Sequence, residues 1–462
     1  MTTEKRSAIP LQTRVTCPHC WSAFPPDQVL WIAQHPDLVG DVRLGKDQAQ
    51  RFLPTRFNVA GAAIDARGFA CHELACANCH LPVPRALIET PPVFISILGA
   101  PACGKSYFLA SMSWRLRKVL PKYFALGCSD ADPTANRRLV EYENLQFLNP
   151  NQNELVAIEK TETHGDYYDT VLYEDQAVNY PRPFLFSVTP QEAHPNRRAA
   201  AKASCVLCLY DNAGESFLPG SDTATNPVTR HLLQSRALVF LFDPTQDIRF
   251  RQACQGKTND PQMTRQSQRL QRESPVRQET ILAEAAQRVR RFAGLPQHAK
   301  HSRPLVVAVT KYDCWSSLLG AERLDHPWVA GADGSVGAMN LQQIEGVSRR
   351  LRDLLRKLSP EIVSTAESFA QQVVYVPVSA TGCSPEVHPE TGAFCVRPRN
   401  IRPMWSEVPL LYVMCRWMEG LVPYLAPKSQ AKEALPRSHA NEVSPQSQAK
   451  EAWSYWPLPP PS

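Results

Sequence analysis

The sequence predicts an α/β protein with a mixed, mostly parallel sheet sandwiched by helices and preceded by a cysteine-containing module. Three observations carry this prediction. Short apolar runs alternate with amphipathic helical periods from residue 93 onward, which is typical of strands that are buried on both faces. A glycine-rich loop follows the first of these runs, and two C-x-x-C pairs precede it.

Length and composition favour a globular chain of two or three domains. The 462 residues are 43% hydrophobic and 20% charged, and the net charge of +6 is too small to argue for nucleic acid by itself. The first residues lack the apolar core of a signal peptide, and no run approaches the roughly 18 apolar residues of a membrane span. We therefore expect a cytoplasmic protein whose 14 cysteines are mostly reduced.

Changes in composition divide the chain into three segments. Residues 1–90 are predicted to form the cysteine module, residues 91–424 the α/β domain, and residues 425–462 a disordered tail rich in proline and serine. The strands are predicted at 93–98, 184–188, 205–210, 237–242, 305–309 and 373–378, and the helices at 106–120, 279–294, 341–358 and near 407–420.

Two insertions interrupt the alternation of strands and helices. Residues 121–183 are predicted to hold an extra strand, a helix near 134–147 and a hairpin around 166–180. Residues 248–277 are basic and rich in glutamine and arginine. A solvated loop is the simpler interpretation of that charge, and a docking surface for an acidic partner is the alternative.

The first apolar run leads into the sequence GAPACGKS, in which Gly99, Gly104, Lys105 and Ser106 have the spacing G-x-x-x-x-G-K-[ST]. The backbone N–H groups of such a loop surround the phosphates of a nucleoside triphosphate. The lysine would reach the β- and γ-phosphates, the serine hydroxyl would bind Mg²⁺, and the glycines would permit unusual backbone dihedrals. The nucleotide-binding residues predicted in this loop are Gly99, Ala100, Pro101, Ala102, Cys103, Gly104, Lys105, Ser106 and Tyr107.

An acidic residue ends a second apolar run. Asp211 follows the run at 205–210, and Gly214 comes three residues later. The carboxylate can hold Mg²⁺ directly or through water, and the glycine N–H can bond to the γ-phosphate. The D-x-x-G spacing is weak alone, but it is informative after a strand of a phosphate-loop protein.

The choice of base depends on two later strands. Thr310, Lys311 and Asp313 end one strand in a T-K-x-D pattern. A carboxylate there accepts hydrogen bonds from both N1–H and the 2-amino group of guanine, which adenine cannot offer in that arrangement. Lys311 would lie across the base and the phosphate loop. Ser379 and Ala380 end the last strand, where a backbone N–H can donate to guanine O6, so the sequence predicts GTP rather than ATP.

The ordered motifs GAPACGKS, DNAGE, TKYD and SATG resemble those of the TRAFAC clade, the translation-factor and Ras-type GTPases, over about residues 92–420. The resemblance implies a P-loop GTPase fold with one antiparallel edge strand, a Mg²⁺–GTP site and two switch segments that move on hydrolysis. The cysteine module and the long first insertion are similar to a bacterial branch of large GTPases in multi-gene defence or conflict systems. Members of that branch act beside a second GTPase or other NTPases, so protein partners are expected.

Two departures from the family pattern bear on specificity and hydrolysis. Thr310 stands where asparagine is commoner, and guanine specificity should survive this change. Glu215 stands where Ras-type proteins carry a water-orienting glutamine, so hydrolysis is expected to be slow or to need an arginine from a partner. Thr161 is the predicted switch-I threonine and Mg²⁺ ligand, with Thr163 and Thr170 as alternatives. The predicted catalytic residues are Lys105, Glu215 and Thr161, and the predicted magnesium ligands are Ser106, Asp211 and Thr161.

The cysteine module carries two C-x-x-C pairs, Cys17 with Cys20 and Cys76 with Cys79. Two such pairs of thiolates complete a tetrahedral zinc site with no open position, so a structural zinc ribbon is predicted. The interval between the pairs is longer than in a simple ribbon and predicts an inserted subdomain. Packing or redox cysteines are the weaker interpretation, and DNA or RNA binding by the module is not favoured. The alternative ligands are His19, Cys71, His72 and His80.

Three functions agree with these motifs to different degrees. A regulatory GTPase that switches with Mg²⁺–GTP and docks protein partners agrees best. An inactive scaffold that binds nucleotide without turnover is kept open by Glu215. An ATP-using motor or kinase would share only the phosphate loop, and the TKYD sequence argues against it.

Overall fold

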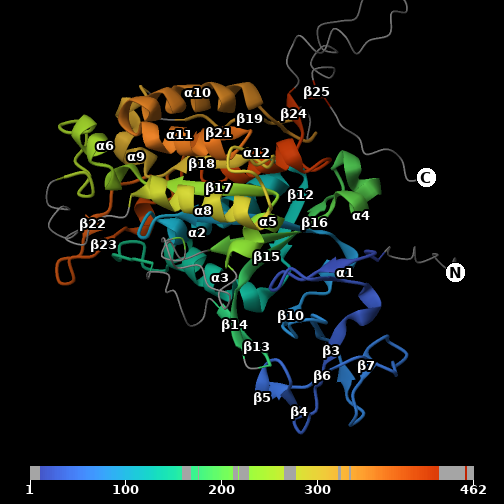
Figure 1. Cartoon of the computed structure of the whole chain (residues 1–462). Helices are drawn as coiled ribbons and strands as arrows, with labels where there is room; N and C mark the ends of the chain where they lie inside the picture. The colour runs from blue at the N-terminus through green and yellow to red at the C-terminus, as the bar shows by residue number, and fades with distance from the viewer. Residues whose placement is uncertain are drawn as a thin grey trace, which may run out of the picture.

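The computed structural model describes residues 11–158, 168–174, 176–211, 217, 228–264, 277–320, 324–331, 335–425 and 453–454. Within them a seven-stranded sheet has the order β12-β15-β16-β11-β17-β18-β21 (Figure 1). Its strands are β11 (Pro92–Gly99), β12 (Leu126–Asp130), β15 (Pro183–Pro190), β16 (Cys205–Asp211), β17 (Ala237–Phe242), β18 (Leu305–Val309) and β21 (Val373–Pro377). All six apolar runs are therefore strands, as predicted, and β12 is the predicted extra strand.

The sheet is mixed and mostly parallel. β15 is antiparallel to both of its neighbours, β12 and β16, whereas the remaining pairs from β16 to β21 are parallel. The family resemblance implied that the antiparallel strand would lie at the edge. That expectation is wrong, because β12 from the first insertion pairs along β15 and becomes the edge strand itself.

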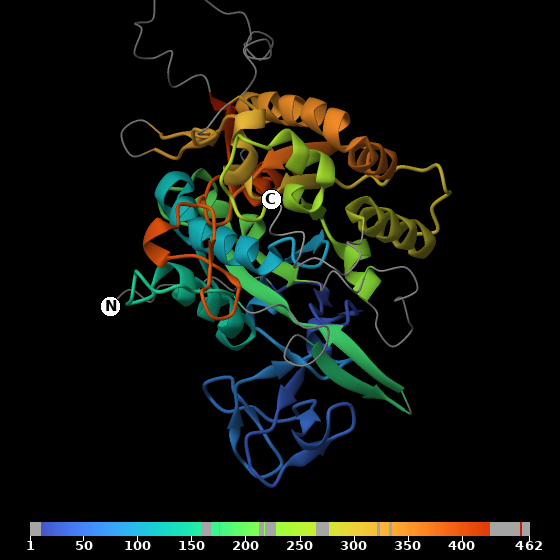
Figure 2. The same ribbon diagram turned by 90° about the vertical axis from the view of Figure 1, so that its left-hand side faces the viewer.

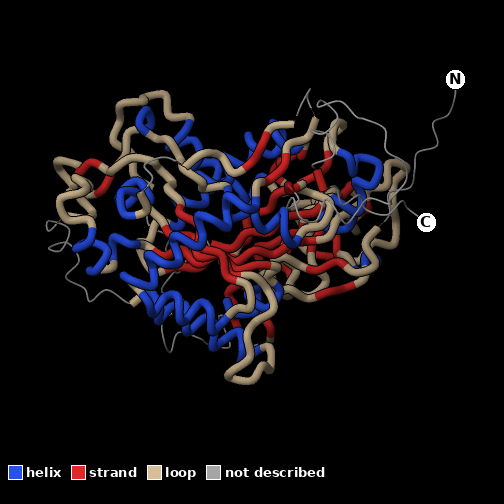
Figure 3. The backbone as a smooth tube through the Cα atoms, turned by 90° about the horizontal axis from the view of Figure 1, so that it is seen from above, coloured by secondary structure: helices blue, strands red, loops and turns tan. Residues whose placement is uncertain are grey.

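Helices pack against both faces of this sheet (Figure 3). On one face α2, α3 and α12 share a core with the strands, and on the other face α5, α8 and α11 do so. The longer helices are α2 (Lys105–Phe124), α3 (Pro133–Phe147), α5 (Val228–Gln234), α8 (Gln278–Phe292), α10 (Leu341–Leu358), α11 (Pro360–Phe369) and α12 (Val408–Trp417). The short ones are α1 (Ala86–Glu89), α4 (Ala200–Ala203), α6 (Ile248–Ala253) and α9 (Tyr312–Trp315). The predicted helices are confirmed within a few residues at their ends.

The N-terminal module consists of short strands at one end of the molecule (Figure 2). It covers the part of the second sheet face where β15 and β16 lie, since Trp21 shares a core with Val206, Cys208 and Tyr210 of β16. The module strands are β1 (Val15–Thr16), β2 (Ala23–Phe24), β3 (Leu30–Ile32), β4 (Val39–Asp41), β5 (Gly45–Ala49), β6 (Arg51–Phe52), β7 (Ala63–Ile64), β8 (Ala70–Cys71), β9 (Leu74–Ala75) and β10 (Pro82–Val83). Successive side chains of β16 therefore point to opposite faces of the sheet, one set packing against the helices and the other against the module.

The first insertion contains the predicted strand, helix and hairpin. The hairpin is formed by β13 (Tyr168–Tyr173) and β14 (Gln176–Pro181). It reaches the module, because the backbone N–H of Leu172 donates to the carbonyl oxygen of Arg43 at 2.8 Å. The hairpin therefore braces the module against the α/β domain (Figure 1).

The described part of the second insertion, residues 248–264, is not a solvated loop. Phe250, Asp260 and Met263 are buried there. The ring of Phe250 meets that of Trp315 edge-on, with centroids 6.1 Å apart. Apolar side chains such as Phe250 of α6 pack this segment against the core, although the surrounding sequence is basic. Residues 265–276 of the insertion lie outside the described residues.

Short strands also form two small sheets near the C-terminus. The first contains β19 (Trp328–Val329), β20 (Ala338–Met339), β24 (Tyr424–Leu425) and β25 (Trp453–Ser454), and the second contains β22 (Glu386–Val387) and β23 (Phe394–Cys395). Of the predicted tail, the structure describes residues 425, 453 and 454. None of the described helices combines the length and the hydropathy that a membrane span requires.

Candidate functional site

The phosphate-loop motif forms the expected strand–loop–helix junction. β11 ends at Gly99 and α2 begins at Lys105. Gly104 has φ +89°, a left-handed conformation that favours glycine, and it leads directly into the helix. Lys105 is only 7% exposed, and its Nζ donates to the carbonyl oxygens of Gly99 and Ala100 at 3.3 Å each. Its ammonium group is therefore held over the loop, at the N-terminal end of a helix dipole.

Gly99 is required for close packing rather than for unusual dihedrals. A Cβ atom at this position would lie 2.7 Å from Sγ of Cys103 and 3.0 Å from the carbonyl oxygen of Leu241. Of these two glycines, only Gly104 has a positive φ. Burial raises the pKa of Cys103, so this thiol stays uncharged and fills the space that the missing side chain leaves.

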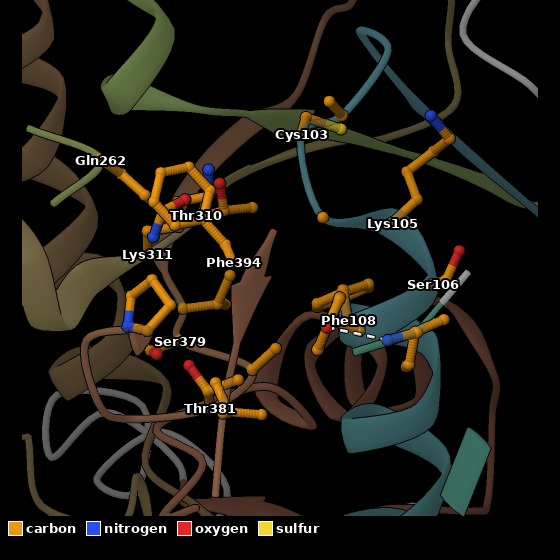
Figure 4. A pocket seen from close by; sticks show the side chains of 18 of the residues that line it. Cys103, Lys105, Ser106, Phe108, Gln262, Thr310, Lys311, Ser379, Thr381 and Phe394 are labelled. Atoms are coloured by element: carbon orange, nitrogen blue, oxygen red, sulfur yellow. Dashed lines mark hydrogen bonds between the residues drawn. The ribbon is translucent and has the colours of Figure 1, made fainter. Parts of the chain in front are cut away.

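The loop borders a cavity of about 350 Å³ (Figure 4). Three of the predicted motif segments meet there: the loop, the turn after β18 and the turn after β21. The predicted residues that line it are Pro101, Ala102, Cys103, Gly104, Lys105, Ser106, Tyr107, Thr310, Lys311, Ser379 and Ala380. Further lining residues, which the sequence did not indicate, are Phe108, Ile158, Gln262, Val378, Thr381, Pro385, Phe394 and Val396. Its volume falls in the range of small-molecule sites.

Asp313 lies beside this cavity in direct contact with the last strand's turn. Its Oδ1 accepts a hydrogen bond from the hydroxyl of Ser379, and that hydroxyl oxygen accepts from the backbone N–H of Gly382 at 2.8 Å. Burial raises the pKa of the Asp313 carboxyl above 3.8, against the lowering effect of the Ser379 hydrogen bond. The charge of Asp260 raises this pKa further. The two predicted base-reading motifs thus form one unit.

Lys311 is anchored by an acid that belongs to none of the sequence motifs. Its Nζ donates to Oδ2 of Asp243 at 2.7 Å and to Oγ1 of Thr245 at 3.0 Å. Asp243 is fully buried after β17, and the side-chain oxygen of Gln278 accepts from its backbone N–H. The sequence did contain a signal for Asp243, since it comes directly after a buried parallel strand. The carboxyl ends of such strands meet at one edge of the sheet, where ligands bind.

Asp211 lies buried at that same edge, as the last residue of β16. Gly214, Glu215 and Thr161 lie outside the described residues. Ile158 is the last described residue before Thr161, and its backbone N–H donates to the hydroxyl of Tyr107 at 2.9 Å. Tyr107 therefore holds the backbone of Ile158 in the cavity wall.

The second insertion contributes Gln262 to the cavity wall. The buried carboxylate of Asp260 accepts from the backbone N–H of Gln262 at 2.7 Å and from Sγ of Cys314 at 3.2 Å. Cys314 directly follows Asp313 in the chain. The hydrogen bond between Cys314 and Asp260 therefore links the second insertion to the turn that carries Asp313. No sequence pattern indicates this contact, since Asp260 and Cys314 are 54 positions apart.

The four predicted cysteines come together in one buried cluster. Their Sγ atoms all lie within 4.8 Å of one another, and Cys17–Cys79 and Cys20–Cys76 are each 3.7 Å apart. Four thiolates around a zinc ion at about 2.3 Å lie about 3.8 Å from each other, so the donor set fits tetrahedral zinc. Burial raises the pKa of Cys17 and of Cys79, and a bound cation would offset that preference for the neutral thiol.

The turns that carry the cysteines have the same backbone pattern. Trp21 and His80 each follow a cysteine pair with a positive φ, of 59° and 63°. His80 is not in the cluster, because its Nδ1 lies 2.9 Å from a carboxylate oxygen of Asp41. His19, Cys71 and His72 also lie outside the cluster, so within the described part of the chain its donors come from the two C-x-x-C pairs.

No family model and no curated protein matches the chain. Among solved structures it is similar to the Ski7 GTPase-like domain of S. cerevisiae bound to GTP, with 11% identity and a TM-score of 0.24 over 63% of this chain and 43% of that one. Era, in complex with MgGDPNP and nucleotides 1506–1542 of 16S ribosomal RNA, shows 11% identity and a TM-score of 0.19 over 63% of this chain and 52% of that one. The SRb-GTP/SRX complex of the signal recognition particle receptor from Chaetomium thermophilum shows 14% identity and a TM-score of 0.24 over 64% and 96%. The chain thus spans about half the length of the first two chains.

Proposed function

We propose that the chain is a guanine-nucleotide-binding protein that hydrolyses GTP in the presence of Mg²⁺. One observation carries the proposal: the loop with Lys105 and the turns with Lys311 and Ser379 border the same cavity. Phosphate-binding and base-reading groups must lie this way to hold the two ends of one nucleotide. An ATP-using protein would share the loop and would have no use for a carboxylate at Asp313.

The residues around the cavity have the chemistry that such a ligand needs. Lys105 and the backbone N–H groups at the start of α2 would bind phosphate oxygens, and Ser106 and Asp211 would hold Mg²⁺. Asp313 would accept from the guanine N1–H and 2-amino groups, with Ser379 fixing its orientation. Thr161 and Glu215 are proposed on sequence grounds to complete the catalytic set.

The cysteine cluster is proposed as a structural zinc site. The four thiols form a closed donor set, which is typical of zinc that stabilises a small domain. We further propose that the protein works as a regulatory switch with protein partners, such as a second GTPase or another NTPase. The support for this wider role is the motif resemblance alone.

A single-turnover assay tests the central proposal. Purified full-length protein in excess over GTP should convert it to GDP and phosphate with Mg²⁺, and the conversion should stop when the metal is chelated. ATP in the same assay should remain unchanged. Binding of GTP without turnover would favour the scaffold, and equal use of ATP would remove the guanine assignment.

A further inference from the structure

Tyr210 joins the first cysteine pair to the central sheet through two hydrogen bonds. Its hydroxyl donates to the carbonyl oxygen of Pro18 at 2.5 Å and accepts from Nε1 of Trp21 at 2.9 Å. Pro18 lies between Cys17 and Cys20, and Trp21 follows directly. Both partners therefore belong to the turn that presents two of the four thiols.

The phenol ring of Tyr210 also stacks on His231 of α5. The ring centroids are 4.7 Å apart with an interplanar angle of 14°. Nδ1 of His231 lies 2.6 Å from Oγ of Ser96, whose Oγ lies 2.5 Å from that of Ser235. Burial lowers the pKa of His231 to about 3, so the ring is neutral in this buried stack. A path of direct contacts, two hydrogen bonds and one ring stack, thus runs from Trp21 through Tyr210 and His231 to Ser96 of β11.

This path ends next to the candidate nucleotide site. Tyr210 is the neighbour of Asp211 on β16. Ser96 is its register partner on β11, three positions before Gly99. Tyr210 and Asp211 end a strand that pairs with β11 on one side and β15 on the other, so the position of the tyrosine bears on that of the acid.

We propose that Tyr210 is a positioning residue for Asp211 and couples the four-cysteine site to Mg²⁺-dependent nucleotide binding. This rests on the proposed function, because it needs Asp211 to act at a Mg²⁺–GTP site. A buried, hydrogen-bonded network has few alternative arrangements, since each group left unpaired is costly. The shape of the first cysteine turn therefore fixes the phenol, and the phenol fixes the end of β16.

Tyr210→Phe tests the coupling, because it removes the hydroxyl and keeps the ring. The readout is the ratio of the GTP dissociation constants without and with Mg²⁺. We expect this ratio to fall about fivefold or more, while the dissociation constant without Mg²⁺ changes by less than about twofold. Tyr180→Phe is the matched control: its ring lies 5.8 Å from Trp21 in the same interface, but it belongs to β14 and not to the central sheet.

Reciprocity gives a second readout that does not depend on turnover. Mg²⁺–GTP should change the apparent zinc affinity of the full-length protein, measured against a chelating indicator, by the same factor by which zinc changes the affinity for Mg²⁺–GTP. Tyr210→Phe should abolish that change. Trp21→Phe removes the donor on the other side of the hydroxyl and gives the same test if Tyr210→Phe does not fold.

The outcomes separate this inference from the function on which it rests. An unmutated protein that binds no GTP overturns the proposed function. A protein that binds GTP with a Mg²⁺ enhancement that survives in Tyr210→Phe overturns the coupling and leaves the proposed nucleotide binding intact. A protein that binds GTP but carries no zinc overturns the coupling together with the zinc site.

Discussion

Ser379 donates its hydroxyl hydrogen to Oδ1 of Asp313 at 2.5 Å, across 66 positions of sequence. The sequence indicates each residue as a separate base-reading group, and the structure makes them one group. Because the hydroxyl oxygen also accepts from the N–H of Gly382, its hydrogen has a single direction. The carboxylate is thus oriented before a base arrives, which lowers the entropy that binding must overcome.

Asp313→Asn should exchange guanine for xanthine preference. Ser379 can still donate to the amide oxygen, so the new NH₂ group would face the 2-amino group of guanine, donor to donor. GTP affinity should fall about a hundredfold or more, and XTP, which has a carbonyl there, should gain. Competition binding with GTP, XTP and ATP measures this. Equal loss of GTP and XTP would show that Asp313 does not read the base.

Guanine binding should weaken on acidification. Burial and the charge of Asp260 raise the pKa of Asp313 above 3.8 in the folded protein. A protonated carboxyl presents a donor where an acceptor is needed, so affinity is complete above this raised pKa and is lost as the pH falls through it. Asp260→Asn should move the midpoint of a GTP-binding titration to lower pH. XTP binding to Asp313→Asn, which has no proton to gain there, serves as the control, and a midpoint that Asp260→Asn leaves in place would contradict the assignment.

Lys105→Ala should abolish tight GTP binding. Its ammonium group is the buried cation that the loop carbonyls of Gly99 and Ala100 hold in place. Lys118→Ala removes the same charge from an exposed position of α2 and should leave the affinity unchanged. Isothermal titration calorimetry of both variants with GTP–Mg²⁺ measures the two affinities. Full affinity in Lys105→Ala would exclude the phosphate-loop interpretation.

About one zinc ion per chain should be found by elemental analysis of the purified protein. Cys76→Ser should lose the metal and unfold the module, while nucleotide binding without Mg²⁺ persists because other segments build the cavity. Cys71→Ser is the matched control. Cys71 is also buried in the module, but its thiol donates to a carboxylate oxygen of Asp65 and is not part of the four-cysteine cluster. Protein isolated without chelators and free of zinc would refute the metal site.

Gln262→Ala should weaken GTP binding by roughly five- to tenfold, because it removes a polar side chain from the cavity wall. Gln255→Ala, an exposed position of the same insertion, should have no effect. The dissociation constants of the two variants, compared with that of the unmutated protein, give the result. A Gln262→Ala variant with unchanged affinity would leave the insertion without a part in nucleotide binding.

The sequence by itself determined the helices and strands of the α/β domain, the phosphate loop and the four cysteines, because each of these is encoded by residues close together in the chain. Apolar runs of six residues such as 237–242 are typical of strands buried on both faces of a sheet, and this run is β17. The loop from Gly99 to Ser106 and the cysteine pairs carry their chemistry at short range, so spacing is enough to recognise them.

Tertiary structure decided what depends on pairing between distant segments. Periodicity reports that a side chain is buried and does not report its partner. For this reason Asp243 beneath Lys311, Asp260 beside Asp313, and β12 at the edge of the sheet could not be inferred. The contact of Trp21 with Tyr210 is of the same kind, because 189 positions separate a cysteine turn from the strand that it supports.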